Sequence, residues 1–421
     1  MKRITIIIIA LIISACSGNK TNSQKTDTLI HCHINGVVND RPESRKLLLY
    51  VGVDGNIASS SQPYSEIKIR NGQFSYDLHL DEPQYCELVF EDELKNGYWQ
   101  AIDFVADNGT INMNLYPTEE VGKTGIEGPV STTEYQSYKV ELRKLQDATN
   151  EIRNKLKEEE KTYTEQYSSL ITQIEALENN SPKQKQLIEQ IQAMTEEQTY
   201  APETLAERKR YQAERLAKML EIVTGEPSTA RLALLAKQMK YQLPHQELVD
   251  AFNNIYAVKM PDNAMTKFCL RQIEGFQLQI GSQYIDFEAP DLEGQMHRLS
   301  NMVNGAKLVM LDLWASWCGP CRKASMEMIP LYEQYKEKGF MVIGVARESE
   351  NTQNMQAAIK KDGYKWPQLV ELDDRANIWA KYGCNNAAGR LILFDAEGKI
   401  LAFDPTIEEL KAAIQKHIDT N

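Results

Sequence analysis

The segment Trp317-Cys318-Gly319-Pro320-Cys321 decides how this chain folds, because it places two cysteines two residues apart. The run 307–314 before it is mostly apolar with one carboxylate, which predicts a buried strand of a central sheet. After it, apolar residues recur at helical spacing through position 335. The pair therefore belongs at the N-terminal end of a helix, where the helix dipole favours a thiolate and Pro320 suits the first turn.

Two cysteines at this spacing predict thiol–disulfide exchange, and we expect neither a metal nor a cofactor. Cys318 lies at the exposed first end of the helix and is the expected nucleophile, whereas Cys321, one turn further in, is expected to be buried and to resolve the mixed disulfide. Asp312, in the preceding strand, would accept the proton of Cys321 if burial raises its pKa. Alternatively, Asp312 faces solvent or caps a neighbour. The residues expected to shape the site are Trp317, Gly319 and Pro320.

Composition limits the class of protein. A length of 421 residues predicts two or three domains, and 42% hydrophobic with 25% charged residues is typical of a globular protein. The net charge of −12 argues against a nucleic-acid partner, because phosphate binding needs basic patches. No group of histidines and cysteines has the spacing of zinc ligands.

The first residues have the pattern of an export signal. Lys2 and Arg3 precede a short apolar run, and Ser14-Ala15-Cys16 follows it. Residues 1–15 resemble the signal peptide of a bacterial lipoprotein, which implies that Cys16 is lipidated and anchors the chain to a membrane. The alternative is an ordinary secretory signal. Residues 16–28 form a polar tether, and Ser17 does not resemble an inner-membrane retention signal, which favours the outer membrane.

Residues 29–130 predict an all-β, sandwich-like domain, because short alternating runs are separated by turn residues such as Asn71-Gly72. Residues 131–278 predict a helical region. Within it, an apolar seam from Tyr138 to Leu177 followed by a break at Asn179–Pro182 indicates a long antiparallel helical hairpin. The seam would also suit dimerisation through a coiled coil.

Residues 279–421 predict an α/β domain, in which strand–helix–strand is followed by an antiparallel hairpin and a last helix. This is the element order of thioredoxin. The cysteines outside the pair either form a disulfide in the oxidising environment of an exported protein or are small buried apolar residues. They are Cys32, Cys86, Cys269 and Cys384.

These motifs resemble the thioredoxin-fold, TlpA/ResA-like thiol-disulfide oxidoreductases, whose motif Trp317–Lys323 matches and whose buried acid Asp312 matches. Residues upstream resemble the uncharacterised β-rich domain often fused to such lipoproteins. The glutamate of the family is absent, since Ala324 stands in its place. The family also places a cis-proline opposite the disulfide, where this chain has Ala388 and Gly389. We therefore expect a trans peptide and a reshaped loop there.

The resemblance implies a membrane-anchored oxidoreductase of the cell envelope that faces the periplasm. It would act as a reductant, because Gly319-Pro320 resembles the pair in thioredoxin. Its partners would be envelope proteins with disulfides and a thiol-reducing electron donor in the membrane. Two alternatives are a partner-binding lipoprotein with a secondary redox domain and a peroxiredoxin-like antioxidant. Leu311 and Ala315 stand where the peroxide site of the latter needs proline and threonine.

Overall fold

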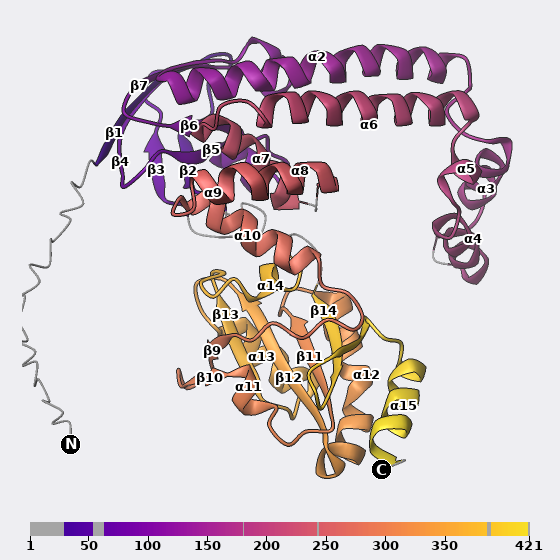
Figure 1. The fold of residues 1–421 in the computed structure, drawn as a ribbon. Helices are drawn as coiled ribbons and strands as arrows, with labels where there is room; N and C mark the ends of the chain where they lie inside the picture. Colours follow the sequence, from indigo (N-terminus) through magenta and orange to yellow (C-terminus); the bar gives the residue numbers. More distant parts are fainter. Residues whose placement is uncertain (1–28, 54–62, 180, 242–243, 385–388, 420–421) are drawn as a thin grey trace, which may run out of the picture.

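The computed structural model has three parts in chain order (Figure 1). A β-rich part comes first, a helical part follows, and an α/β part comes last. Helix α10 (Ala264–Phe276) of the helical part contacts α14 (Ile378–Lys381) of the α/β part. The segment with Cys16 lies outside the described residues. The structure describes residues 29–53, 63–179, 181–241, 244–384 and 389–419.

Two four-stranded sheets make up the described β-rich part, with the strand orders β4-β1-β7-β8 and β3-β2-β5-β6. Strand β4 alternates exposed and buried residues as its sequence alternates polar and apolar ones, so Phe74 and Leu78 enter the core. Both sheets contribute to this core. The strands are β1 (Ile30–Val38), β2 (Lys46–Val51), β3 (Ser65–Lys68), β4 (Gln73–Leu80), β5 (Gln84–Phe90), β6 (Ile102–Ala106), β7 (Gly109–Leu115) and β8 (Gly125–Glu127), with helix α1 (Glu91–Lys95) after β5.

The cysteines outside the redox pair are core residues. Cys32 and Cys86 lie in the core between the two sheets, and both are free and buried. Cys269 and Cys384 are also free and buried. This confirms the interpretation of the four as small apolar residues rather than as partners in a second disulfide.

Two long helices, α2 (Val130–Glu158) and α6 (Pro202–Val223), lie side by side in the helical part (Figure 1). The prediction that the first arm continues to Leu177 and turns at Asn179–Pro182 is wrong. Helix α2 ends at Glu158, and three short helices occupy the far end of the arm.

The apolar seam continues past Glu158 for a different reason than the one predicted. The ring of Tyr163 stacks on those of Tyr167 and Tyr200, with centroids 4.7 and 5.9 Å apart. These aromatic residues pack the short helices together instead of extending α2. The other helices of this part are α3 (Glu165–Glu175), α4 (Pro182–Gln192), α5 (Glu196–Thr199), α7 (Thr229–Tyr241), α8 (Gln246–Ala251) and α9 (Ala257–Lys259).

A buried carboxylate joins the β-rich part to the helices. Asp103 of β6 is only 3% exposed and forms ion pairs with Lys139 of α2 and Lys237 of α7. The hydroxyl of Tyr135 also donates to it, at 2.6 Å. Burial alone would raise the pKa of Asp103, but attraction to the two lysines outweighs burial and lowers it.

The α/β part has a five-stranded sheet with the order β13-β12-β11-β14-β15. The central strand β11 is buried at all seven residues, as its apolar run predicts. It runs parallel to β12 and antiparallel to β14. Helices α12 and α15 contact one another. The elements are β9 (Glu288–Pro290), β10 (Met296–Arg298), α11 (Leu299–Met302), β11 (Leu308–Trp314), α12 (Gly319–Tyr335), β12 (Phe340–Glu348), α13 (Gln353–Asp362), β13 (Gln368–Leu372), α14, β14 (Arg390–Asp395), β15 (Ile400–Phe403) and α15 (Ile407–Ile414).

Replacement of Asp103 by asparagine should destabilise the protein by about 3–5 kcal/mol, because it leaves two partly buried lysines without their counter-charge. Since its folded pKa is lowered, the stabilisation by Asp103 is fully present above the unfolded value of about 4 and is lost as pH falls below it. Urea unfolding of Asp103→Asn at pH 7 and at acidic pH measures both effects. Asp81→Asn removes an exposed carboxylate and is the control. Equal unfolding midpoints for the two variants would contradict the expectation.

Candidate active site

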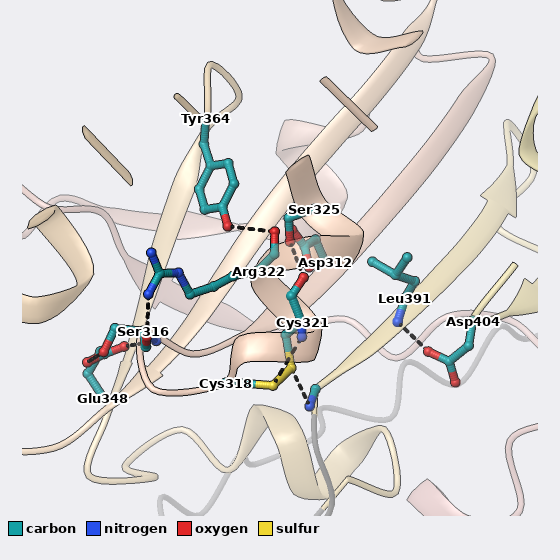
Figure 2. The surroundings of a disulfide bond; sticks show 11 residues. Asp312, Ser316, Cys318, Cys321, Arg322, Ser325, Glu348, Tyr364, Leu391 and Asp404 are labelled. Carbon is teal, nitrogen blue, oxygen red and sulfur yellow. Dashed lines mark hydrogen bonds between the residues drawn. A yellow bond between two sulfur atoms is a disulfide. The ribbon is translucent and has the colours of Figure 1, made fainter. Parts of the chain in front are cut away.

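Helix α12 begins at the two cysteines, which are joined in a disulfide with their Cα atoms 5.3 Å apart (Figure 2). Cys318 is the N-cap residue, and the backbone N–H of Cys321 points at its Sγ from 3.3 Å. Pro320 occupies the first turn, where a missing N–H costs nothing. The positive end of the helix dipole therefore lies at Cys318 and would stabilise a thiolate there once the disulfide is reduced.

The prediction that Cys318 is exposed and Cys321 buried is wrong for this disulfide state. Cys318 is 4% exposed and Cys321 is 9% exposed. The N–H of Cys318 donates to the carbonyl of Ala315 at 3.0 Å, and this turn folds Cys318 back against the sheet. The exposed group at the site is Trp317, at 57%, whose ring centroid lies 6.4 Å from that of buried Trp379.

Asp312 lies in β11 and is only 1% exposed, so it does not face solvent. Its single described polar partner is the hydroxyl of Ser325, which donates to Oδ2 at 2.7 Å (Figure 2). Burial raises the pKa of Asp312 to about 7, although the hydrogen bond from Ser325 opposes the rise. The carboxyl group therefore changes its protonation state close to neutral pH.

Ser325 connects this acid to the redox pair and is a site residue that the sequence motifs do not reveal. The residue is fully buried and lies one helical turn after Cys321, whose carbonyl oxygen accepts a second contact from the hydroxyl at 3.0 Å. A hydroxyl has one proton, so Ser325 donates either to Asp312 or to Cys321 at any moment. The four-residue spacing from Cys321, on the helix face towards β11, is the signal that could have found it.

Gly389 covers the other side of the resolving cysteine. Its backbone N–H donates to the Sγ of Cys321 at 3.1 Å. A Cβ atom at this position would overlap the carbonyl oxygen of Leu313, so only glycine allows the approach. Residues 385–388, with Ala388, lie outside the described residues, and the predicted reshaped loop and trans peptide lie there too.

Two polar clusters hold the loop before the helix in place (Figure 2). The carboxylate of Glu348, which is 5% exposed, accepts hydrogen bonds from the N–H and the hydroxyl of Ser316, both at 2.7 Å. Arg322 forms a two-pronged ion pair with Asp362, at 2.7 and 2.8 Å, and also donates to the carbonyl of Ser316 at 3.2 Å. These contacts join residues far apart in the sequence and could not be inferred from its local pattern.

The described residues hold no cluster of three or more histidines, cysteines or acids that could bind a metal. The redox pair, Asp312 and Gly389 are thus brought together by β11, α12 and the start of β14, while Trp317 lies at the rim. Such an arrangement can exchange a disulfide: it holds a sulfur pair, a donor N–H at each sulfur and a buried group that titrates near pH 7.

Comparison with known proteins agrees with this geometry. Residues 280–403 match the AhpC/TSA family, and residues 32–141 match a domain of unknown function (DUF4369). The thiol-disulfide oxidoreductase ResA of Bacillus thuringiensis (strain Al Hakam) is 30% identical over 143 residues, which are 33% of this chain and 79% of the relative. A ResA of Bacillus cereus is 31% identical over 144 residues, again 33% and 79%.

Among solved structures, the thioredoxin domain of a thiol-disulfide oxidoreductase from Bacteroides vulgatus is 30% identical. It covers 34% of this chain and 99% of its own, with a TM-score of 0.31 over the whole molecule. The match to ResA spans the strand, the cysteine pair and the helix that build the site. Through its C-terminal domain, the chain belongs to the TlpA/ResA-like thiol-disulfide oxidoreductases.

Proposed function

We propose that this oxidoreductase is anchored by lipid on Cys16 in the bacterial cell envelope and reduces disulfides of other envelope proteins. The observation that carries the redox role is the Cys318–Cys321 disulfide at the start of α12, linked through Ser325 to buried Asp312. The anchor rests on the sequence before residue 17. None of the helices that the structure describes is long and apolar enough to cross a bilayer.

The reaction begins with both cysteines reduced. The thiolate of Cys318, stabilised by the helix N-terminus, attacks one sulfur of the substrate disulfide, and the other substrate sulfur leaves as a thiolate that takes up a proton. Cys321 then loses its proton to Asp312 and attacks Cys318. The substrate leaves with its second thiol, and the chain holds the disulfide seen here. A thiol-reducing membrane electron donor would restore the dithiol.

Asp312 and Ser325 would manage the proton in the second step. With a pKa of about 7, the carboxyl group is partly ionised at neutral pH and accepts a proton readily. While Asp312 is ionised, the hydroxyl of Ser325 donates to it; after protonation, the same hydroxyl is free to donate to the carbonyl of Cys321. The exchange of partners keeps every buried polar group satisfied in both protonation states.

The direction of the reaction, the partners and the location remain proposals. Gly319-Pro320 between the cysteines supports a reductant, and Ser17 after the lipid cysteine supports the outer membrane. Pairing of two chains through α2 and α6 would form a dimer. The relatives named as oxidoreductases support disulfide exchange over a peroxide reductase.

Replacement of Cys321 by serine should trap the mixed disulfide, because the sulfur that releases the substrate is gone. We expect Cys321→Ser, expressed in a bacterial envelope, to yield adducts with other proteins on non-reducing gels, which disappear on addition of dithiothreitol. Cys318→Ser is the matched control and should trap far fewer. The proposed role fails if Cys321→Ser forms no adduct and its Cys318 does not react with iodoacetamide.

Replacement of Asp312 by asparagine should slow the resolving step about 10²-fold or more, because the proton acceptor is lost. In the unmodified chain this step should speed up as pH rises, with a midpoint near 7, and the variant should lack that midpoint. Stopped-flow measurement of Trp fluorescence against pH tests this.

The same variant separates catalysis from folding. Because burial raises the folded pKa of Asp312 above its unfolded value, the linked stability is full below about pH 4 and is lost as pH rises through about 7. Asp312→Asn should therefore unfold at higher urea than the parent above pH 7, by up to about 4 kcal/mol. A slower step combined with lower stability would mean that the variant is simply misfolded.

Replacement of Ser325 by alanine should move the pH midpoint of the resolving step upward. The hydrogen bond from Ser325 favours the charged carboxylate, and a bond to a charged group contributes about 1.5–3 kcal/mol, or roughly one to two pH units. Ser316→Ala removes a hydroxyl of the same type that contacts Glu348 instead, and it should leave the midpoint in place. A midpoint that stays near 7 in Ser325→Ala would show that Ser325 does not act on Asp312.

A further inference from the structure

We propose that the helical part binds a small molecule that carries an anionic group on an apolar body. The site is a hollow of about 480 Å³ enclosed by α2, α6 and α7, the helices that contact one another at the base of the long arm (Figure 1). Pockets that bind small molecules commonly measure about 300–1,000 Å³ and combine apolar walls with a few polar groups. The hollow lies in a different part of the molecule from the disulfide, so the proposal is independent of the redox role.

Four cationic side chains line this hollow. Lys139 and Arg143 lie one turn apart on α2, Arg215 comes from α6, and Lys237 comes from α7. Among the described residues that line the hollow, none is acidic. Such a gathering of positive charge is unexpected in a chain with a net charge of −12, because like charges repel and raise the free energy of the fold.

The protein compensates only part of this charge. Beneath the hollow, the single carboxylate of Asp103 pairs with both lysines. Arg215 donates to the neutral amide of Gln238 at 2.8 Å, and Arg143 has no hydrogen-bond or ion-pair partner among the described residues. Four positive charges against one negative charge leave three in excess.

Nearby acids do not supply the difference, because they are engaged elsewhere. Glu141 of α2 lies 3.6 Å from Lys218, and Glu214 of α6 lies 2.6 Å from Arg210. Burial and repulsion from Lys237 and Arg143 lower the pKa of Lys139, even though Asp103 opposes the change. A bound anion would relieve this repulsion.

The rest of the lining fixes the second property of the ligand. Apolar surface comes from Leu142, Met219 and Leu234, and the ring of Tyr135 adds to it. The two arginines offer planar, two-pronged donors that match a carboxylate or a phosphate group. The ligand is therefore an amphipathic anion, with its charged end at the arginines and its body against the apolar wall.

Isothermal titration calorimetry of the purified full chain tests the proposal with octanoate and octyl phosphate. We expect saturable binding of at least one of them in a ratio of one to one, and the tighter of the two identifies the ligand as a carboxylate or a phosphate. Octyl glucoside supplies the apolar body without charge, and inorganic phosphate supplies the charge without the body. Binding of either control as tightly as the anionic probes would overturn the proposal, and so would the absence of saturable binding of both probes.

Variants locate the site. Arg143→Gln combined with Arg215→Gln should weaken binding at least tenfold, because both guanidinium groups are lost while the lysines and Asp103 are kept. Lys144→Gln is the matched control, since it removes one exposed positive charge from the neighbouring position of α2 outside the hollow, and it should bind within twofold of the parent. Unchanged affinity in the double arginine variant would overturn the assignment. Both variants should reduce insulin disulfides at the parent rate, which shows that the fold is intact.

Discussion

A carboxyl group buried in the middle of a central strand is the constraint around which the redox site is built. Strand β11 is covered on both faces, so Asp312 has no access to water, and a buried carboxylate without a partner is costly. The hydroxyl of Ser325 meets this need, and the same hydroxyl reaches the carbonyl of Cys321. Helix α12 is thereby held in one rotational position against β11. The residue that satisfies the acid also fixes where the sulfur pair lies.

The two sulfurs are treated differently by the backbone around them. The N–H of Cys321 points at the Sγ of Cys318, within the first turn of the helix, whereas the N–H of Gly389 points at the Sγ of Cys321 from the neighbouring strand. Both contacts favour negative charge on sulfur. Cys318 receives in addition the helix dipole, so it is the better thiolate at rest. Cys321 needs a base to lose its proton, and Asp312 is the buried acid connected to it.

How much could be predicted from the sequence depends on whether the partner of a residue is close in the chain. Strand β11 and helix α12 follow from an apolar run and a helical period, which are local patterns. Strand β13 does not follow from its sequence, because two of its five residues, Gln368 and Glu371, are polar yet buried. Gln368 accepts a hydrogen bond from the indole of Trp314, and Glu371 accepts three from the backbone at the start of α14. The first of these partners is 54 residues away, and nothing in the local pattern reveals it.

The charges between the β-rich and helical parts pose a different question from the redox site. Asp103 joins β6 to α2 and α7, and for that purpose one lysine would be enough. Stability does not require the further cations, because buried ion pairs are often replaced by apolar residues of similar volume without loss. Arg143 and Arg215 pair with no carboxylate among the described residues, so they add repulsion rather than cohesion. An anion in the hollow would turn this repulsion into binding energy, and Asp103 would then serve to orient two of the four cations towards it.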